Sequence, residues 1–97
     1  MCDAKTISLV ISDDEGPMIG ASMNHFRDGV RINMTISDFD GFIHNCIITN
    51  GDIISFSYVG YKVKEIIIKD INAIDGTLIV NMTKGSNKKK ETIIIGE

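Results

Sequence analysis

The feature that most constrains this chain is a recurring alternation of apolar and polar residues in short runs, without the apolar period of a helix. Ile7, Leu9 and Ile11 occupy alternate positions of the first run, and Ile54 and Phe56 do so in a later one. Successive side chains of a strand point to opposite faces, so this period predicts strands with one apolar face. Isoleucine dominates the apolar residues, and its branched β-carbon suits a pleated sheet. The sequence therefore predicts an all-β protein.

Glycine, asparagine and aspartate separate these runs and mark the expected turns. Asn50-Gly51 is the pair most typical of a tight hairpin, and residues 13–17 and 38–41 are rich in turn formers. Residues 25–30 are expected to form a loop. Seven short strands at this spacing indicate a β-sandwich. The expected strands cover residues 5–12, 19–24, 31–37, 42–48, 53–59, 61–69 and 77–83.

The length of 97 residues is that of one domain. Residues 1–83 are predicted to form the sandwich, and residues 84–97 a polar linker followed by a β-prone tail. The tail's isoleucines at 93–95 have two interpretations, a strand added to a partner or another strand of this domain. Both stay open at this point.

The buried face of residues 42–48 also stays open. A slip of one residue in strand register exchanges the two faces, and both carry apolar side chains. One face would hold Phe42, His44, Cys46 and Ile48, and the other would hold Ile43, Asn45 and Ile47.

Charge and composition exclude several classes of function. The net charge is −3, and the basic residues cluster only at Lys84 and 88–90, so we expect no nucleic-acid partner.

No apolar run has the length of a membrane-spanning helix, and the first residues lack a signal-peptide core. Two cysteines, Cys2 and Cys46, make no disulfide framework, and free thiols are the favoured interpretation. A mature N-terminal Cys2 would also suit a lipid anchor.

Three segments, in this order, resemble one family of domains. They read Asp-Asp-Glu-Gly-Pro-Met-Ile-Gly-Ala-Ser at 13–22, Ser-Asp-Phe-Asp-Gly at 37–41, and Gly-Asp-Ile-Ile-Ser-Phe-Ser-Tyr-Val-Gly-Tyr-Lys at 51–62. Together they resemble the carboxypeptidase regulatory-like domain, in the version found at the N-terminus of SusC-type TonB-dependent outer-membrane receptors of Bacteroidetes. Leu9 departs from the family, which usually has glycine there, and the first turn is one residue shorter.

The resemblance implies a prealbumin-like (transthyretin-like) sandwich that is periplasmic or associated with the outer membrane, and it does not imply catalysis. The leading hypothesis is a non-catalytic extracytoplasmic interaction or accessory domain, whose partner is an outer-membrane receptor or another envelope protein. The alternative is a stand-alone secreted or periplasmic binding or immunity-type protein that recognises an envelope protein or a toxin. The chain would be a receptor fragment in the first case and a free-standing relative in the second.

Two clusters contain residue types that metal sites or nucleophiles use. Asp38 and Asp40 begin like a calcium loop but lack its later glutamate, so we expect them to hydrogen-bond their own turn. His44 and Cys46 lie two residues apart and would share a strand face. With His25 or Cys2 they could in principle ligate zinc, but zinc-site spacing and an orienting third group are missing. We therefore expect no catalytic residue, no cofactor and no metal.

The expected partner-binding residues lie in the tail, which resembles the segment following this domain in the receptors. An exposed apolar β-run invites pairing with another strand, either in a partner or in a strand-exchanged or edge-paired dimer. The tail residues are Glu91, Thr92, Ile93, Ile94, Ile95 and Gly96.

Overall fold

The computed structural model describes residues 4–96 as two facing β-sheets, with one short 3₁₀ helix, η1 (Ile71–Ala73), and no α-helix in that range. All-β architecture and the two-layer arrangement are thus confirmed. Within residues 4–96 nine strands occur where seven were expected, because Gly16–Pro17 and the tail also pair. The strands are β1 (Ala4–Asp13), β2 (Gly16–Pro17), β3 (Ser22–Arg27), β4 (Val30–Ile36), β5 (Phe42–Thr49), β6 (Ile53–Ser57), β7 (Val63–Ile68), β8 (Thr77–Asn81) and β9 (Lys90–Ile95).

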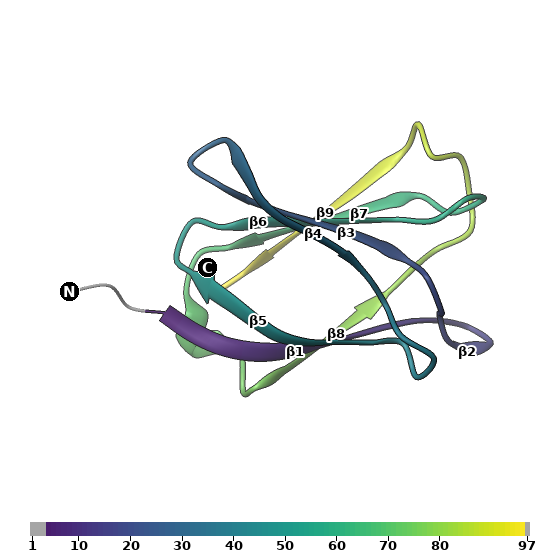
Figure 1. Cartoon of the computed structure of the whole chain (residues 1–97). Coiled ribbons are helices and arrows are strands. Elements are labelled where there is room, and N and C mark those ends of the chain that lie inside the picture. The colour runs from purple at the N-terminus through teal and green to yellow at the C-terminus, as the bar shows by residue number, and fades with distance from the viewer. Residues whose placement is uncertain (1–3, 97) are drawn as a thin grey trace.

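The strands form a four-stranded and a five-stranded layer. The first sheet has the order β2-β1-β5 with β8 also paired to β1, and the second has the order β4-β3-β6-β7-β9. Figure 1 shows the two layers one above the other, with β1, β5 and β8 below and the other sheet above. Most pairs are antiparallel, but β8 runs parallel to β1 and β9 runs parallel to β7. The parallel pairs need long connections, which the local sequence pattern does not reveal.

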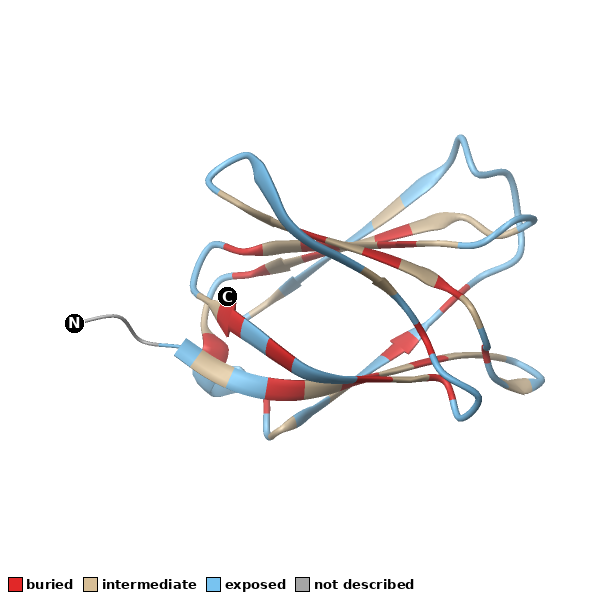
Figure 2. Cartoon of the chain, viewed as in Figure 1, coloured by how far each residue is buried: buried red, intermediate tan, exposed pale blue. Residues whose placement is uncertain are grey.

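The buried residues form one hydrophobic cluster, and they recur as red segments along the strands of both layers (Figure 2). Ile7, Leu9 and Ile11 of β1 are buried together, and Ile54 and Phe56 face them from β6. These are the alternating positions that the sequence predicted to share an apolar face. Burial of such side chains is the main favourable contribution to folding, roughly 1.5–3 kcal/mol for each large one.

Residues 25–30 were expected to be a loop, and this expectation was wrong. Strand β3 continues to Arg27, and the turn consists of Asp28 and Gly29, whose φ angles are 53° and 78°. Two central residues with positive φ make the type I′ turn, and Asp-Gly is one of its preferred pairs. The Asp28-Gly29 pair in the sequence is this hairpin signal.

Strand β5 resolves the ambiguity about residues 42–48 with a β-bulge. Its pairing with β1 shifts between Ile7 and Leu9, and Asn45 has a φ of 58°. The bulge inserts one extra residue, so the alternation changes phase within the strand. Ile43 is buried before the bulge, and Cys46 and Ile48 are buried after it. Neither of the two expected faces is therefore the buried one.

The tail forms β9, an edge strand of the second sheet. It pairs with β7 over its whole length, from Val63–Lys90 to Ile68–Ile95. The segment before it is also tied to the domain, because Lys84 bridges to Tyr61 and the Gly85 amide donates to the Gly60 carbonyl. Within residues 4–96 the tail is therefore another strand of this domain.

Cys2, which the sequence suggests as a free thiol or a lipid-anchor site, lies outside the described residues. Across 4–96, no helix has the length and apolar character needed to cross a bilayer.

Candidate functional site

The bulge in β5 separates His44 from Cys46, the two residues considered as zinc ligands or as a nucleophile with its base. The His44 side chain is exposed and stacks on Phe42, with ring centroids 4.9 Å apart and an interplanar angle of 9°. Cys46 points into the core and is 3% exposed. The two side chains lie on opposite faces, so the expectation that they share a face was wrong. The positive φ of Asn45 is the physical reason.

Cys46 instead lies next to His25, and His25 in turn contacts Asp52, which the sequence did not single out. The Sγ of Cys46 lies 3.9 Å from Nδ1 of His25, and Nε2 of His25 lies 2.7 Å from Oδ2 of Asp52. All three side chains are buried, with exposures of 3%, 2% and 0%. Strands β3 and β5 and the turn before β6 each contribute one member. No local pattern links residues from three elements, so this cluster could be found only from the fold.

Asp52 connects the members of this cluster because its carboxylate accepts hydrogen bonds from several neighbours. Arg27 donates to both carboxylate oxygens, from Nε at 2.9 Å and from Nη2 at 2.8 Å. Thr49 donates its main-chain amide at 3.0 Å and its hydroxyl at 2.8 Å. Although burial raises the pKa of this carboxyl, the hydrogen bonds from Arg27, Thr49 and His25 outweigh it and hold the pKa well below its usual range. The buried carboxylate is therefore charged and fully paired.

The thiol of Cys46 is uncharged near neutral pH, in contrast to the carboxylate of Asp52. Burial, helped by the negative charge of Asp52, raises the pKa of Cys46 to about 11. A thiol with that pKa is protonated near neutral pH, whereas nucleophiles and metal ligands are thiolates. The cluster therefore works as an internal hydrogen-bond network that fastens β3 to the β5–β6 turn.

The acidic turn residues mainly complete their own turns. Oδ1 of Asp38 accepts from the amides of Asp40 and Phe42, each at 2.9 Å, which confirms the expected turn role of Asp38. Oδ1 of Asp13 accepts from the amide of Glu15 at 2.8 Å. Among residues 4–96, no three histidine, cysteine or acidic side chains are grouped as metal ligands.

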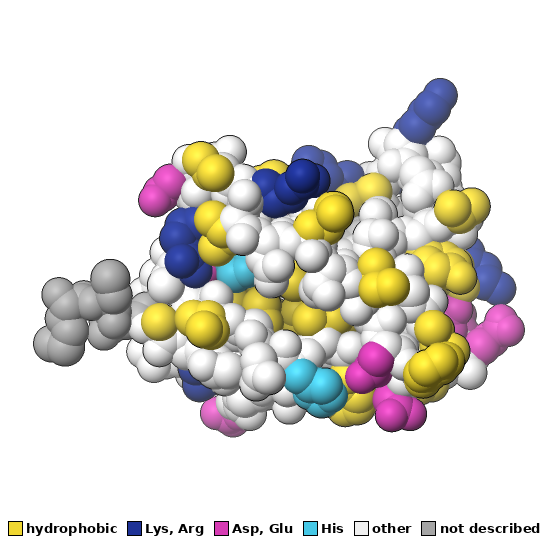
Figure 3. Space-filling view, viewed as in Figure 1, with side chains coloured by type: hydrophobic (Ala, Val, Ile, Leu, Met, Phe, Trp, Pro, Cys, Tyr) yellow, Lys and Arg dark blue, Asp and Glu magenta, His cyan; other side chains and the backbone are white. Residues whose placement is uncertain are grey.

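Strand β4 is the most exposed part of the sheets. Its apolar side chains at alternate positions are 45–62% exposed, and none of its seven residues is buried. Within the described chain β4 pairs only with β3, so no strand lies beside its other edge, and the Met34 amide donates to Oδ1 of Asn33 at 2.9 Å. Figure 3 shows hydrophobic side chains on the face of the molecule that this strand crosses. The four side chains are Val30, Ile32, Met34 and Ile36.

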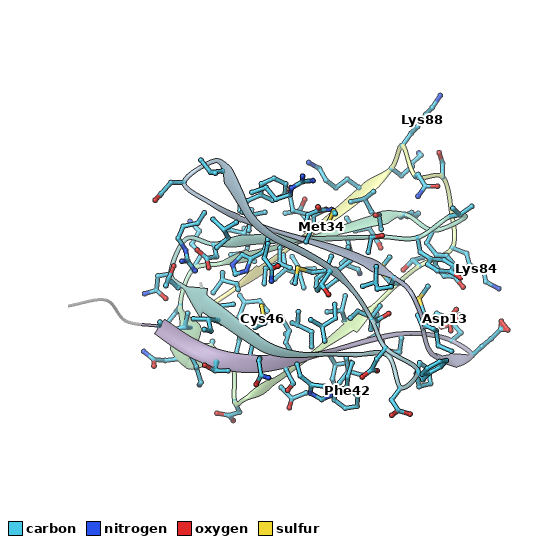
Figure 4. The ribbon with its side chains drawn as sticks, in the orientation of Figure 1. Asp13, Met34, Phe42, Cys46, Lys84 and Lys88 are labelled. Atoms are coloured by element: carbon cyan, nitrogen blue, oxygen red, sulfur yellow. The ribbon has the colours of Figure 1, made fainter. Side chains whose placement is uncertain are left out.

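A shallow groove runs between the edges of the two sheets, from β4 to β5. It has a volume of about 340 Å³, and its lining includes Thr35, Asp38 and His44. Figure 4 shows Met34 and Phe42 coming from the two layers that border this side, with Cys46 between the layers. Asp38 and His44 contribute a carboxylate and an imidazole, 3.8 Å apart at Oδ2 and Nε2. This side of the sandwich is open and bordered by two free strand edges.

The tail residues named from the sequence lie on both faces of β9. Lys64 Nζ is 3.3 Å from Oε1 of Glu91, and this ammonium lowers the pKa of the Glu91 carboxyl. Ile95 packs against the core, whereas Ile93 and Ile94 are more than two-fifths exposed. The tail is bonded to its own sheet on one edge, and its other edge has no strand beside it within residues 4–96.

Gly96 closes the tail against the loop after β7. The amide of Lys69 donates to the Ile95 carbonyl at 2.8 Å, which holds the strand end in place. A β-carbon at Gly96 would lie 2.4 Å from Cβ of Asp70, and the φ of Gly96 is 84°. Only glycine fits this position, so Gly96 has a packing role in this chain.

No protein-family model matches the chain, and no curated protein is significantly similar to it. The resemblance to the carboxypeptidase regulatory-like domain therefore stays a prediction based on the three segments quoted above.

Proposed function

We propose that this chain is a non-catalytic interaction domain of the carboxypeptidase regulatory-like type, with a prealbumin-like sandwich, that acts outside the cytoplasm by protein–protein contact. The observation that carries the proposal is the exposed apolar edge strand β4. The family resemblance supports the extracytoplasmic setting and an envelope protein as the partner.

Strand β4 has the two properties that strand addition requires. Its free edge offers main-chain donors and acceptors, and its aliphatic side chains at alternate positions offer apolar contacts. Proteins generally protect such edges with lysine, proline or a covering segment. β4 contains neither lysine nor proline, and Arg31 is its one charged residue.

The packing of β4 indicates that these apolar residues are not needed for the core. Residues that stabilise a fold by burial are inside, and the exposed aliphatics of β4 leave water only if something outside the sandwich covers them. A partner strand beside β4 would extend the second sheet from five to six strands. The tail strand β9 is the other free edge of that sheet and enters the proposal as a second contact surface.

Lysine substitutions on β4 test this proposal. Met34→Lys and Ile36→Lys change side chains that are 61% and 62% exposed, so the fold should tolerate them. Ile79→Lys is the matched control, because Ile79 is 65% exposed on the edge strand β8 of the other sheet. The tagged variants are used to isolate partners from the host envelope, and the recovered protein is purified for an affinity measurement.

We expect the two β4 variants to lose binding to the purified partner and the Ile79 variant to keep it. The proposal is overturned if all three variants bind the partner like the parent chain. Loss of binding in the Ile79 variant alone would place the contact on the β8 edge and would also overturn it. Size-exclusion chromatography of the parent chain shows whether a second copy is the partner.

A further inference from the structure

A second groove lies at the end of the sandwich where residues 13–19 meet residues 58–61, away from the middle of β4. It has a volume of about 320 Å³ and is bordered by the turn after β1 and the loop after β6. Figure 4 shows Asp13 and Lys84 at this end. Acidic, basic and apolar side chains lie next to one another there in Figure 3. Its apolar lining consists of Pro17, Met18 and Ile19.

The walls of the groove combine two aromatic rings with two carboxylates. Tyr58 and Tyr61 lie edge to face, with ring centroids 5.7 Å apart and an interplanar angle of 73°. The Tyr61 hydroxyl donates to Oδ2 of Asp13, which fixes one ring and raises the pKa of Tyr61 to about 12. Glu15 lines the same groove, and Tyr58 is 40% exposed.

The two tyrosine rings and two carboxylates suit a cationic side chain and would repel an anion. Carboxylates are acceptors only, and the faces of tyrosine rings attract an ammonium or guanidinium group. The apolar lining suits the methylene stem of lysine or arginine, which packs on apolar surface while its head stays near water. A phosphate or an acidic peptide would be repelled by the negative charges of Asp13 and Glu15.

The chain itself already supplies a cation at this place. Lys84 Nζ lies 3.6 Å from Oε2 of Glu15. The hydrogen bond from Tyr61 is the main cause that lowers the pKa of Asp13, and the charge of Lys84 adds a smaller part. Both side chains of the pair are about 70% exposed, at 70% for Lys84 and 72% for Glu15. An exposed ion pair of this kind is weak, so an external cation can replace it at little cost.

We propose that this groove binds a lysine or arginine side chain from an extended, basic segment of a partner protein, in exchange for Lys84. This inference goes beyond the β4 proposal and does not rest on it, because the groove and the edge strand share no residue. A partner could occupy both surfaces, with its strand on β4 and a basic segment at the loop end.

Tyrosine fluorescence gives a direct readout of this groove. The chain has no tryptophan, and its two tyrosines are Tyr58 and Tyr61, so the emission reports on these walls alone. The probe is a blocked Gly-Lys-Gly tripeptide, with Gly-Arg-Gly as a second cation and Gly-norleucine-Gly as the matched neutral control. A ¹⁵N-labelled chain titrated with the same peptides locates the shifts by residue.

We expect the lysine and arginine peptides to change the fluorescence with saturation, and the norleucine peptide to change it at least severalfold less. Glu15→Gln should weaken lysine-peptide binding by about two- to fivefold, and Lys84→Met should strengthen it by a similar factor. Asp75→Asn, which changes an exposed carboxylate outside the groove, should leave the affinity unchanged.

Equal titration curves for the lysine and norleucine peptides would overturn the inference, as would amide shifts confined to residues outside 13–19 and 58–61. An unchanged affinity in the Lys84 variant would show that Lys84 does not compete and would refute the exchange. Since none of these measurements involves β4, they can fail while the edge-strand proposal stands.

Discussion

Replacing Asp52 with asparagine should remove a large part of the domain's stability. The buried carboxylate accepts hydrogen bonds from Arg27, His25 and Thr49, and asparagine keeps the shape but loses the charge and one acceptor oxygen. Removing one partner of a buried charge pair costs roughly 3–5 kcal/mol. Because the Arg27 side chain is 35% exposed and stays hydrated in part, we expect the lower end, about 3 kcal/mol.

Urea unfolding followed by far-ultraviolet circular dichroism measures this loss. A domain of this size has roughly 5–15 kcal/mol of stability in total, and a loss of about 3 kcal/mol lowers the urea midpoint by about 2 M. Asp75→Asn is the control, because Asp75 is exposed, and its midpoint should stay within error. A loss below about 1 kcal/mol for Asp52→Asn would refute the view that this network fastens β3 to the β5–β6 turn.

The same network fixes the direction of the pH dependence. The folded-state pKa of Asp52 is depressed below its unfolded value of about 3.9. The stabilisation is therefore fully present above that unfolded value and is lost as the pH falls toward the folded pKa. The difference in unfolding free energy between the parent chain and Asp52→Asn should be constant from neutral pH to about pH 5 and should narrow below about pH 4. A difference that widens on acidification would contradict the assignment.

Further predictions concern the turn, the thiol and the tail. Gly41→Ala should destabilise the chain by about 2 kcal/mol more than Gly29→Ala in urea unfolding, because both have φ near 78° but only a β-carbon at Gly41 would meet a main-chain oxygen, at 2.6 Å. Similar losses for the two variants would contradict the close packing around Gly41. In a Cys2→Ser background, Cys46 should react with iodoacetamide only after urea is added, because burial raises the pKa of its thiol to about 11. Rapid labelling of the folded chain near neutral pH would contradict its burial. Deleting residues 90–97 should lower the urea midpoint, since β9 pairs with β7 along its length. An unchanged midpoint would show that β9 adds nothing to the stability of the sheet.

The sequence predicted those parts of the fold that depend on short-range pattern. Alternation in β1 and β6 identified the buried faces of Ile7, Leu9, Ile11, Ile54 and Phe56 correctly. The turn role of Asp38 followed from residue chemistry, because an aspartate side chain readily accepts from the amide two residues on. These features are local, so neighbouring residues contain the information.

The features that the sequence did not predict depend on single backbone torsions or on distant pairings. The bulge in β5 requires positive φ at Asn45, and asparagine is enriched at such angles without requiring them. That one torsion decides whether His44 and Cys46 share a face. The meeting of His25 with Asp52 depends on the pairing of β3 with β6, which joins residues far apart in the chain.

In-cell photo-crosslinking tests whether a partner docks on β4. A photoreactive amino acid is placed at position 34 on β4 or, as a control of similar exposure, at position 79 on β8. We expect one discrete crosslinked product from position 34, with a single protein identified by mass spectrometry, and none from position 79. Absence of any product at 34, or the same product from both positions, would contradict docking on β4.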